Sequence, residues 1–320
     1  MYNHVEIRLT MKGEQPLPPH GACLLGSFNL IKYVHGKTFD WQTFEYEIEH
    51  AVRALDNVID NTIYPLEAQA LEAKQKRRMG IGVTALANAG EALGYPYGSD
   101  EFLAFTDKVF ETLTNEAYRA SALLAGEKGT FPLYSANEYL QGKFIQSLNS
   151  DVIELIEQYG IRNSHLISVA PTGTISLSAD NVSGAIEPVF AHHFDRTITN
   201  EDGSFKVERV EDYNVRVFGI EGVTADQLTP KQHLDVLSTV SRWVDSAVSK
   251  TINVGDDVTW DEFKSIYMQA WKSGCKGCTT FRAAGKRYGI LNKVTKDEDP
   301  DEEVATACYI NPLTGKKTCE

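Results

Sequence analysis

The sequence predicts a mixed α/β protein in which helices dominate. Several segments repeat apolar residues at three- and four-residue steps, which is typical of amphipathic helices. One apolar run, 165–170, has the length of a strand and is ended by Pro171 and Gly173. The 320 residues are 42% hydrophobic and 23% charged, within the globular range, so the chain can bury a core. This length fits two average domains or one large α/β domain of barrel size.

The sequence predicts an opening segment without helix, followed by five helices. The Pro- and Gly-rich opening, 13–21, predicts a loop or extended segment, because proline is excluded from helix interiors. A further helix is predicted to begin at Thr259, where Thr259 and Glu262 fit a capping box, and to end before Gly274. Apolar stripes predict the other helices, over 41–59, 102–117, 153–159 and 234–248.

Charge and hydropathy exclude some classes of protein. The chain has 31 Lys and Arg against 44 Asp and Glu, a net charge of −13 that repels phosphate backbones, so no nucleic-acid partner is expected. No apolar run reaches the length of a membrane span, so no membrane partner is expected. The first residues do not have the pattern of a secretory signal. We therefore expect a cytoplasmic protein.

The five cysteines are too few and too scattered for a disulfide scaffold. Cys275 and Cys278 have the spacing of a zinc half-site or a redox dithiol, but a buried, unpaired structural pair is the favoured interpretation. No metal site is expected, and a zinc site completed by Cys308 and Cys319 is the alternative. Exposed free thiols are a liability, so Cys308 and Cys319, which follow an acidic segment, indicate redox use.

A Thr-, Ser- and Gly-rich turn follows the predicted strand. Successive backbone N–H groups in such a turn can cradle a phosphate, but most turns of this kind simply satisfy their own backbone. Taken alone, Glu14 is a surface carboxylate and Cys23 a core residue. The candidate phosphate-binding residues are Pro171, Thr172, Gly173, Thr174, Ile175 and Ser176.

Many specific strings of this chain resemble, in the same order, the catalytic chain of ribonucleotide reductase. The resemblance is to the adenosylcobalamin-dependent class (class II) and covers about 13–292. The strings that carry it are 13–30, 55–60, 77–82, 170–176, 184–190, 245–253 and 274–282.

This resemblance implies a fold and a division of the chain. The expected fold is α/β, the C-terminal half of a ten-stranded α/β barrel, followed by a flexible C-terminal tail. The non-family segment would be 1–12, the barrel portion 13–292, an acidic flexible linker 293–307, and a redox-active cysteine tail 308–320.

The resemblance also implies an activity, the reduction of ribonucleotides to deoxyribonucleotides by radical chemistry. In the family a thiyl radical abstracts the 3′ hydrogen, a glutamate takes the 3′-hydroxyl proton, and two cysteines reduce C2′ while forming a disulfide. By position, Glu14 matches the base and Cys23 one of the reducing pair. Residues 171–176 match the loop that holds the substrate phosphates, and Cys308 and Cys319 match the pair that re-reduces the site.

The implied cofactor is adenosylcobalamin, and the implied partners are a ribonucleotide and a thioredoxin- or glutaredoxin-type reductant. Two alternatives remain. A fragment of a class I large subunit is less expected, because the phosphate loop is of the Thr-Gly-Thr type and no adjacent Tyr-Tyr pair stands near the C-terminus. A non-catalytic nucleotide-binding relic would keep the loop and lose the chemistry.

The chain departs from the family at one decisive place. The family's loop reads Asn-Pro-Cys-Gly-Glu, whereas here Thr10 replaces the asparagine and Lys12 replaces the radical cysteine. Lysine has no S–H bond from which to form a thiyl radical, so the isolated chain is expected to need the N-terminal part, in trans or joined by splicing. The sharp edge at Gly13 predicts an interrupted gene. An intein is disfavoured, because Gly13 provides no nucleophile.

Overall fold

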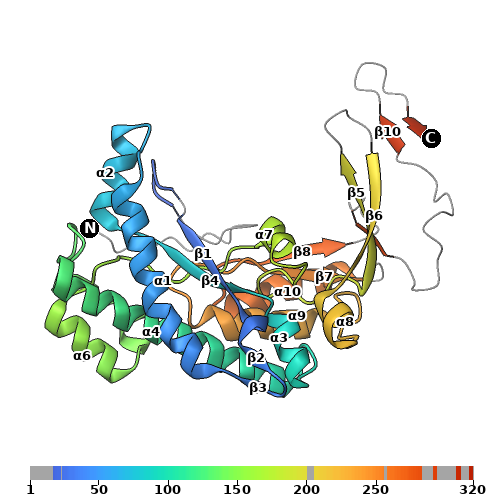
Figure 1. The fold of residues 1–320 in the computed structure, drawn as a ribbon, viewed down its shortest axis with the longest axis horizontal. Helices are drawn as coiled ribbons and strands as arrows, with labels where there is room; N and C mark the ends of the chain where they lie inside the picture. Colours follow the sequence, from blue (N-terminus) through green and yellow to red (C-terminus); the bar gives the residue numbers. More distant parts are fainter. Residues whose placement is uncertain are drawn as a thin grey trace. The chain divides into compact units, whose positions relative to one another are not determined.

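The computed structural model describes residues 17–22, 24–199, 205–255, 258–282, 291–293, 308–310 and 317–319 (Figure 1). The chain divides into two units. Unit 1 comprises 1–192 and 212–288, and unit 2 comprises 193–211 and 289–320.

Unit 1 alternates strands and helices. Its strands are β1 (Leu25–Asn29), β2 (Val34–His35), β3 (Thr38–Phe39), β4 (Gly80–Thr84), β7 (Thr251–Val254) and β8 (Thr279–Arg282). Its helices are η1 (Leu30–Tyr33), α1 (Trp41–Asn61), α2 (Glu67–Lys76), α3 (Leu86–Leu93), α4 (Asp100–Lys128), α5 (Ala136–Tyr139), η2 (Ile145–Ser147), α6 (Ser150–Tyr159), α7 (Gly173–Ser178), α8 (Tyr213–Phe218), α9 (Pro230–Ser241) and α10 (Trp260–Lys272).

β2 and β3 form a small antiparallel pair of their own. The other strands of unit 1 lie side by side in sequence order and run in parallel. β1 pairs with β4, and β4 joins the 165–169 segment through the Ile81–Ile167 bridge. The 165–169 segment in turn joins the segment around Val248 through the Val169–Val248 bridge. The chain continues from Val248 into β7, which pairs with β8. The predicted strand at 165–170 is therefore extended and paired on both sides. No closed barrel forms within the residues described.

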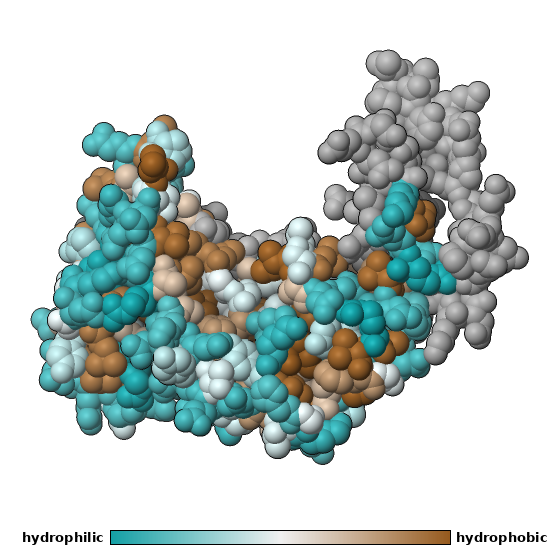
Figure 2. All heavy atoms as spheres, viewed as in Figure 1, coloured by the Kyte–Doolittle hydropathy of each residue, from teal (hydrophilic) through white to brown (hydrophobic). Residues whose placement is uncertain are grey.

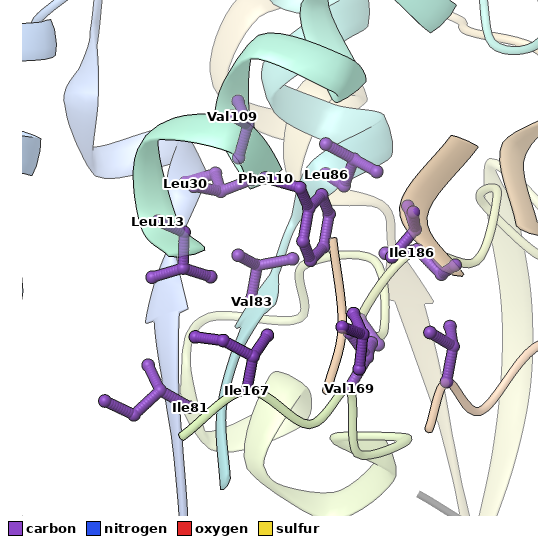
Figure 3. Close-up of a cluster of buried hydrophobic side chains, with 14 of the residues drawn as sticks. Leu30, Ile81, Val83, Leu86, Val109, Phe110, Leu113, Ile167, Val169 and Ile186 are labelled. Carbon is purple, nitrogen blue, oxygen red and sulfur yellow. The ribbon is translucent and has the colours of Figure 1, made fainter. Parts of the chain in front are cut away.

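The helices between these strands form a continuous layer, in which α4 packs against α1, α6 and α9, and α9 packs against α10. A strictly sequential parallel order with right-handed crossovers puts the connecting helices on one side of the sheet. The core lies between the strands and this layer. In Figure 3, strand residues of β4 and the 165–169 segment face apolar side chains of α4; the strand residues are Ile81, Val83, Ile167 and Val169, and those of α4 are Val109, Phe110 and Leu113.

Most of the predicted helices are confirmed. The stripe over 41–59 forms α1, whose first turn is capped by the Asp40 carboxylate accepting the Thr43 N–H at 3.0 Å. The stripes over 102–117 and 153–159 lie in α4 and α6. α10 begins after Thr259 with the expected capping box and ends before Gly274, with Ile266 and Ala270 buried.

The predicted helix over 234–248 is wrong in its second half, because α9 ends at Ser241. Beyond it the chain is extended beside the 165–169 segment, with the Val169 N–H donating to the Ala247 carbonyl at 3.1 Å. The Asp245 carboxylate accepts the N–H groups of Leu166 and Ile167 at 2.6 and 3.1 Å. An aspartate that binds backbone N–H groups elsewhere competes with helix formation, so tertiary pairing overrides the apolar period here.

Unit 2 contains β5 (His193–Thr199) and β6 (Phe205–Glu211), an antiparallel pair extended by β9 (Leu291–Lys293). It also contains an antiparallel pair of short strands, β10 (Cys308–Ile310) and β11 (Lys317–Cys319). Most of the predicted acidic linker, 294–307, lies outside the described residues. Among the helices that are described, none has the length and apolar character needed to cross a membrane.

Candidate functional site

The predicted phosphate loop begins with a residue in an unusual backbone conformation. Thr172 has φ 52° and ψ 22°, in the left-handed region that is costly for a β-branched residue, and it is the N-cap of the short helix α7. Its buried hydroxyl lies 3.0 Å from the Thr84 hydroxyl and accepts the Ala185 N–H at 2.6 Å. The Thr172 carbonyl accepts the Ser176 N–H at 2.8 Å. These contacts fix the start of the loop.

The rest of the loop is open to ligands. Gly173, Thr174 and Ile175 are exposed, and a side-chain carbon added at Gly173 would meet nothing within 4 Å. Within the described residues, their N–H groups have no acceptor, as expected for the first turn of a helix. The hydroxyls of Thr172 and Ser176 are already used inside the protein, since the Ser176 hydroxyl donates to the Gly173 carbonyl at 3.0 Å. The groups that remain for an anion are three backbone N–H groups and the Thr174 hydroxyl.

This loop lies at the carboxyl ends of the parallel strands. It directly follows the 165–169 segment, and Thr172 contacts Thr84, the last residue of β4. Thr84 is opposite Asn29, the last residue of β1, in the β1–β4 register. The carboxyl ends of parallel strands are where α/β folds bind ligands. The loop therefore occupies a position where a ligand site is expected.

An ion pair between a fully buried lysine and a partly buried glutamate lies at the turn that follows the loop. The Lys250 ammonium, which is fully buried, donates to the Glu187 carboxylate at 2.6 Å, to the Thr251 carbonyl at 2.7 Å and to Nδ1 of His233 at 3.0 Å. Burial and the neighbouring Lys250 charge lower the pKa of His233 to about 3, so the imidazole is neutral. Its Nε2–H then donates to the Ala225 carbonyl at 3.2 Å. All three donors of the ammonium have an acceptor, as a buried charge requires.

Neither Glu187 nor Lys250 was assigned a role from the sequence. Glu187 and Lys250 both lie inside strings that carry the family resemblance. Glu187 has apolar neighbours there, whereas Lys250 stands between Ser249 and Thr251. A Lys or Glu is almost never fully buried without a partner. A charged residue in an apolar string was the signal that could have pointed to a buried pair, although the sequence could not name the partner.

A buried carboxyl belongs to Glu91 on α3. Its Oε1 accepts the Val223 N–H at 2.7 Å, whereas Oε2 is buried with no hydrogen-bond partner among the described residues. Burial is the main reason that the pKa of Glu91 is raised to about 7, and the nearby Asp212 carboxylate adds to the shift. This carboxyl is therefore partly protonated near neutral pH.

Cys275 and Cys278 are both buried and unpaired, as the sequence predicted. Burial raises the pKa of the Cys275 thiol, and burial together with the neighbouring Cys275 raises that of Cys278 to about 11. A thiol that stays protonated is a poor nucleophile and metal ligand. In the part of the chain that is described, no group of three or more metal-binding side chains gathers.

Comparison with known proteins identifies the family. The sequence model of the family described as "Ribonucleotide reductase, barrel domain" matches residues 10–222 and 204–281 of the chain. The chain belongs to the ribonucleotide reductase barrel family. This confirms the family predicted from the sequence strings, and it explains a mixed α/β unit of sequential parallel strands. It does not test the number of strands in a complete barrel.

Individual relatives agree with this family. A "Vitamin B12-dependent ribonucleoside-diphosphate reductase" from Thermoplasma acidophilum is 33% identical over 320 aligned residues, covering 91% of this chain and 39% of the relative. A protein of the same name from Mycobacterium tuberculosis is 33% identical, covering 88% of this chain and 42% of the relative. A "Ribonucleoside-diphosphate reductase subunit alpha" from Chlamydia pneumoniae is 29% identical, covering 80% of this chain and 29% of the relative. The chain thus spans about two fifths of the length of the two B12-dependent relatives named above.

The residues assigned from the ribonucleotide reductase resemblance are only partly visible. Glu14 and Cys23 lie outside the described residues. In unit 2, the backbone register of β10 and β11 places Cys308 directly opposite Cys319. Directly opposite residues of an antiparallel pair have Cα atoms about 4.5 to 5.5 Å apart, within the range that a disulfide spans.

Proposed function

We propose that this chain is the C-terminal portion of an adenosylcobalamin-dependent ribonucleotide reductase. It reduces ribonucleotides to deoxyribonucleotides only together with the N-terminal portion that carries the radical cysteine. The observation that carries this proposal is the open parallel sheet of unit 1, with the Thr172 loop at its carboxyl ends, in a member of this family.

The sheet has two edges that call for further strands. β1 pairs only with β4, and β8 only with β7, among the strands described. Leu25 on β1 and Phe281 on β8 are exposed large apolar side chains, and Figure 2 shows apolar surface in the region of these strands. Proteins normally cover strand edges and apolar patches. Unit 1 has five strand positions, namely β1, β4, 165–169, 246–254 and β8. In a ten-stranded barrel these would form one half, and the N-terminal portion would supply the other half.

In this proposal the loop over 171–176 binds the phosphates of the ribonucleotide. The donors available to the phosphate are the N–H groups of Gly173, Thr174 and Ile175, together with the Thr174 hydroxyl. Backbone N–H groups that converge at a turn are suited to phosphate oxygens. Pro171, Thr172 and Ser176 shape the loop, and Thr172 and Ser176 leave no hydroxyl for the ligand.

The chemical steps are assigned by resemblance. Glu14 takes the proton of the 3′-hydroxyl, as a carboxylate within hydrogen-bond reach can do. Cys23 is one member of the dithiol that delivers two electrons to C2′ and becomes a disulfide. Cys308 and Cys319 exchange with that disulfide and are themselves reduced by a thioredoxin- or glutaredoxin-type protein. Their facing register in β10 and β11 supports a pair that alternates between dithiol and disulfide.

Dependence on adenosylcobalamin is proposed from the names of the relatives. Two cavities of the described residues have volumes of about 120 and 320 Å³, and neither could enclose so large a cofactor by itself. When bound, the cofactor would supply the radical.

The test is reconstitution. The chain is expressed with an N-terminal polypeptide that ends in Asn-Pro-Cys, joined ahead of Gly13 or supplied in trans, and ribonucleoside diphosphate reduction is measured with adenosylcobalamin and a small dithiol. We expect deoxynucleotide only when both portions and the cofactor are present. Turnover without adenosylcobalamin would favour the class I alternative. Nucleotide binding without turnover in the joined protein would favour the non-catalytic alternative.

A further inference from the structure

We propose that Glu187 and Lys250 are positioning residues that hold the phosphate loop in its binding conformation. Both lie outside the residues assigned above to binding or chemistry. The inference rests on the proposed function, because it takes the 171–176 loop as the site of the nucleotide phosphates. It adds that the affinity of this loop for phosphate depends on the Glu187–Lys250 ion pair, in which the lysine is fully buried.

The loop conformation needs outside support. Thr172 at φ 52° and Ala185 at φ 43° both lie in the left-handed region, which disfavours residues with a side chain. Such conformations persist only where the surrounding structure over-determines them. The two residues touch each other, since the Ala185 N–H donates to the Thr172 hydroxyl at 2.6 Å. Whatever fixes Ala185 therefore also fixes the start of the loop.

The turn that carries Ala185 is held closely against the loop. A side-chain carbon at Gly184 would lie 3.1 Å from the Pro171 carbonyl, so the two backbones are in near contact. The Glu187 N–H closes the turn by donating to the Gly184 carbonyl at 2.7 Å. Two further hydrogen bonds hold the turn from α3 and its surroundings, since the Ala185 carbonyl accepts the Leu86 N–H at 3.3 Å and the Ile186 carbonyl accepts the Tyr97 hydroxyl at 2.6 Å. The Glu187 side chain adds the anchor to β7.

Glu187 ties this turn to β7 through both carboxylate oxygens. Oε1 accepts the Thr251 N–H at 2.6 Å, and Oε2 accepts from Lys250 at 2.6 Å. Lys250 is held in turn by the Thr251 carbonyl and by neutral His233. The Lys250 side chain is fully buried, and that of Glu187 is 28% exposed. Charge-assisted hydrogen bonds are among the strongest in proteins. A continuous chain of contacts thus runs from β7 through Glu187 and the turn to Thr172.

The decisive variant is Glu187→Gln, which keeps the shape of the side chain and removes the charge that binds Lys250. We expect the amides of Ala185 and Ser176 to exchange hydrogen about ten-fold faster or more, because the loss of one charge-assisted hydrogen bond corresponds to a factor of that size. The exchange rate of the Ile81 amide on β4 should be unchanged. ADP should bind about ten-fold more weakly and adenosine equally well. A matched control is Asp56→Asn, which removes a charge from the buried Asp56–Arg77 pair, whose charged groups lie 2.7 Å apart. This variant should change neither the exchange of the Ala185 and Ser176 amides nor the affinity for ADP.

A second variant guards against poor folding of the first. Thr172→Val breaks the same chain of contacts at its other end, and should speed exchange of the Ala185 amide to a similar extent. If both act through one path, the double variant is no worse than either single variant. Unchanged exchange at Ala185 in Glu187→Gln would overturn the inference even if ADP binds. Failure of the unmodified chain to bind ADP, with faster exchange in the variant, would instead overturn the phosphate site and leave the structural link.

Discussion

Replacing Glu91 with glutamine should remove a specific pH dependence from the stability of unit 1. The Glu91 residue is only 6% exposed, and one of its oxygens has no partner in the described part of the chain. Its pKa rises from the ordinary 4.5 to about 7 in the folded protein, first because of burial. The folded state therefore binds the proton more tightly than the unfolded state.

The sign and size of the effect follow from this difference. The stabilising contribution is complete below pH 4.5 and is lost as the pH rises through 7. A shift from 4.5 to about 7 is worth about 3 kcal/mol in total, at about 1.4 kcal/mol per pKa unit. Between pH 5 and pH 8 the expected loss is about 2.5 kcal/mol. Glutamine is neutral throughout, so the variant should not show this loss.

The assay is urea unfolding of the unmodified chain and of Glu91→Gln at pH 5 and at pH 8. The difference in the free energy of unfolding between the two proteins should shift in favour of the variant by about 2.5 kcal/mol from pH 5 to pH 8. Glu157→Gln, which changes an exposed carboxyl on α6, controls for net charge. A difference between Glu91→Gln and the unmodified chain that is equal at both pH values would refute the reasoning.

The remaining predictions concern the chemistry and the sheet. In an enzyme restored to full length, Glu14→Gln should lower turnover roughly 10²–10⁴-fold and leave nucleotide binding nearly intact, because an amide cannot accept the proton; turnover within a few-fold of the unmodified enzyme would remove Glu14 from the mechanism. Changing Cys308 and Cys319 to Ser should spare a single turnover and block cycling with a thioredoxin, while a small dithiol restores it. Normal cycling with thioredoxin in that variant would exclude a shuttle. Gly82→Ala should cost about 1–3 kcal/mol in urea unfolding, because its new carbon would lie 2.6 Å from the Ser168 carbonyl oxygen of the neighbouring segment; an unchanged midpoint would contradict this close approach.

The sequence by itself determined the elements whose reason is local. The apolar stripes of α1, α4, α6 and α10, and the capping box at Thr259, depend on residues three or four apart, so they could be predicted without knowing the fold. The burial of Cys275 and Cys278 was predicted from the apolar character of a free cysteine, which also depends on no distant partner. The family was recognised from short strings in a fixed order, which also needs no tertiary contact.

Only the tertiary structure decided features whose partners are distant in the chain. The 243–248 segment continues the helical stripe of α9, yet it leaves the helix because Asp245 binds N–H groups 78 and 79 residues away. Glu187 and Lys250 are 63 residues apart, and Thr84 and Thr172 are 88 apart. A buried charge or hydroxyl is stable only with its partner in place. Which partner is available depends on how the strands lie side by side, so these contacts could not be predicted from local sequence.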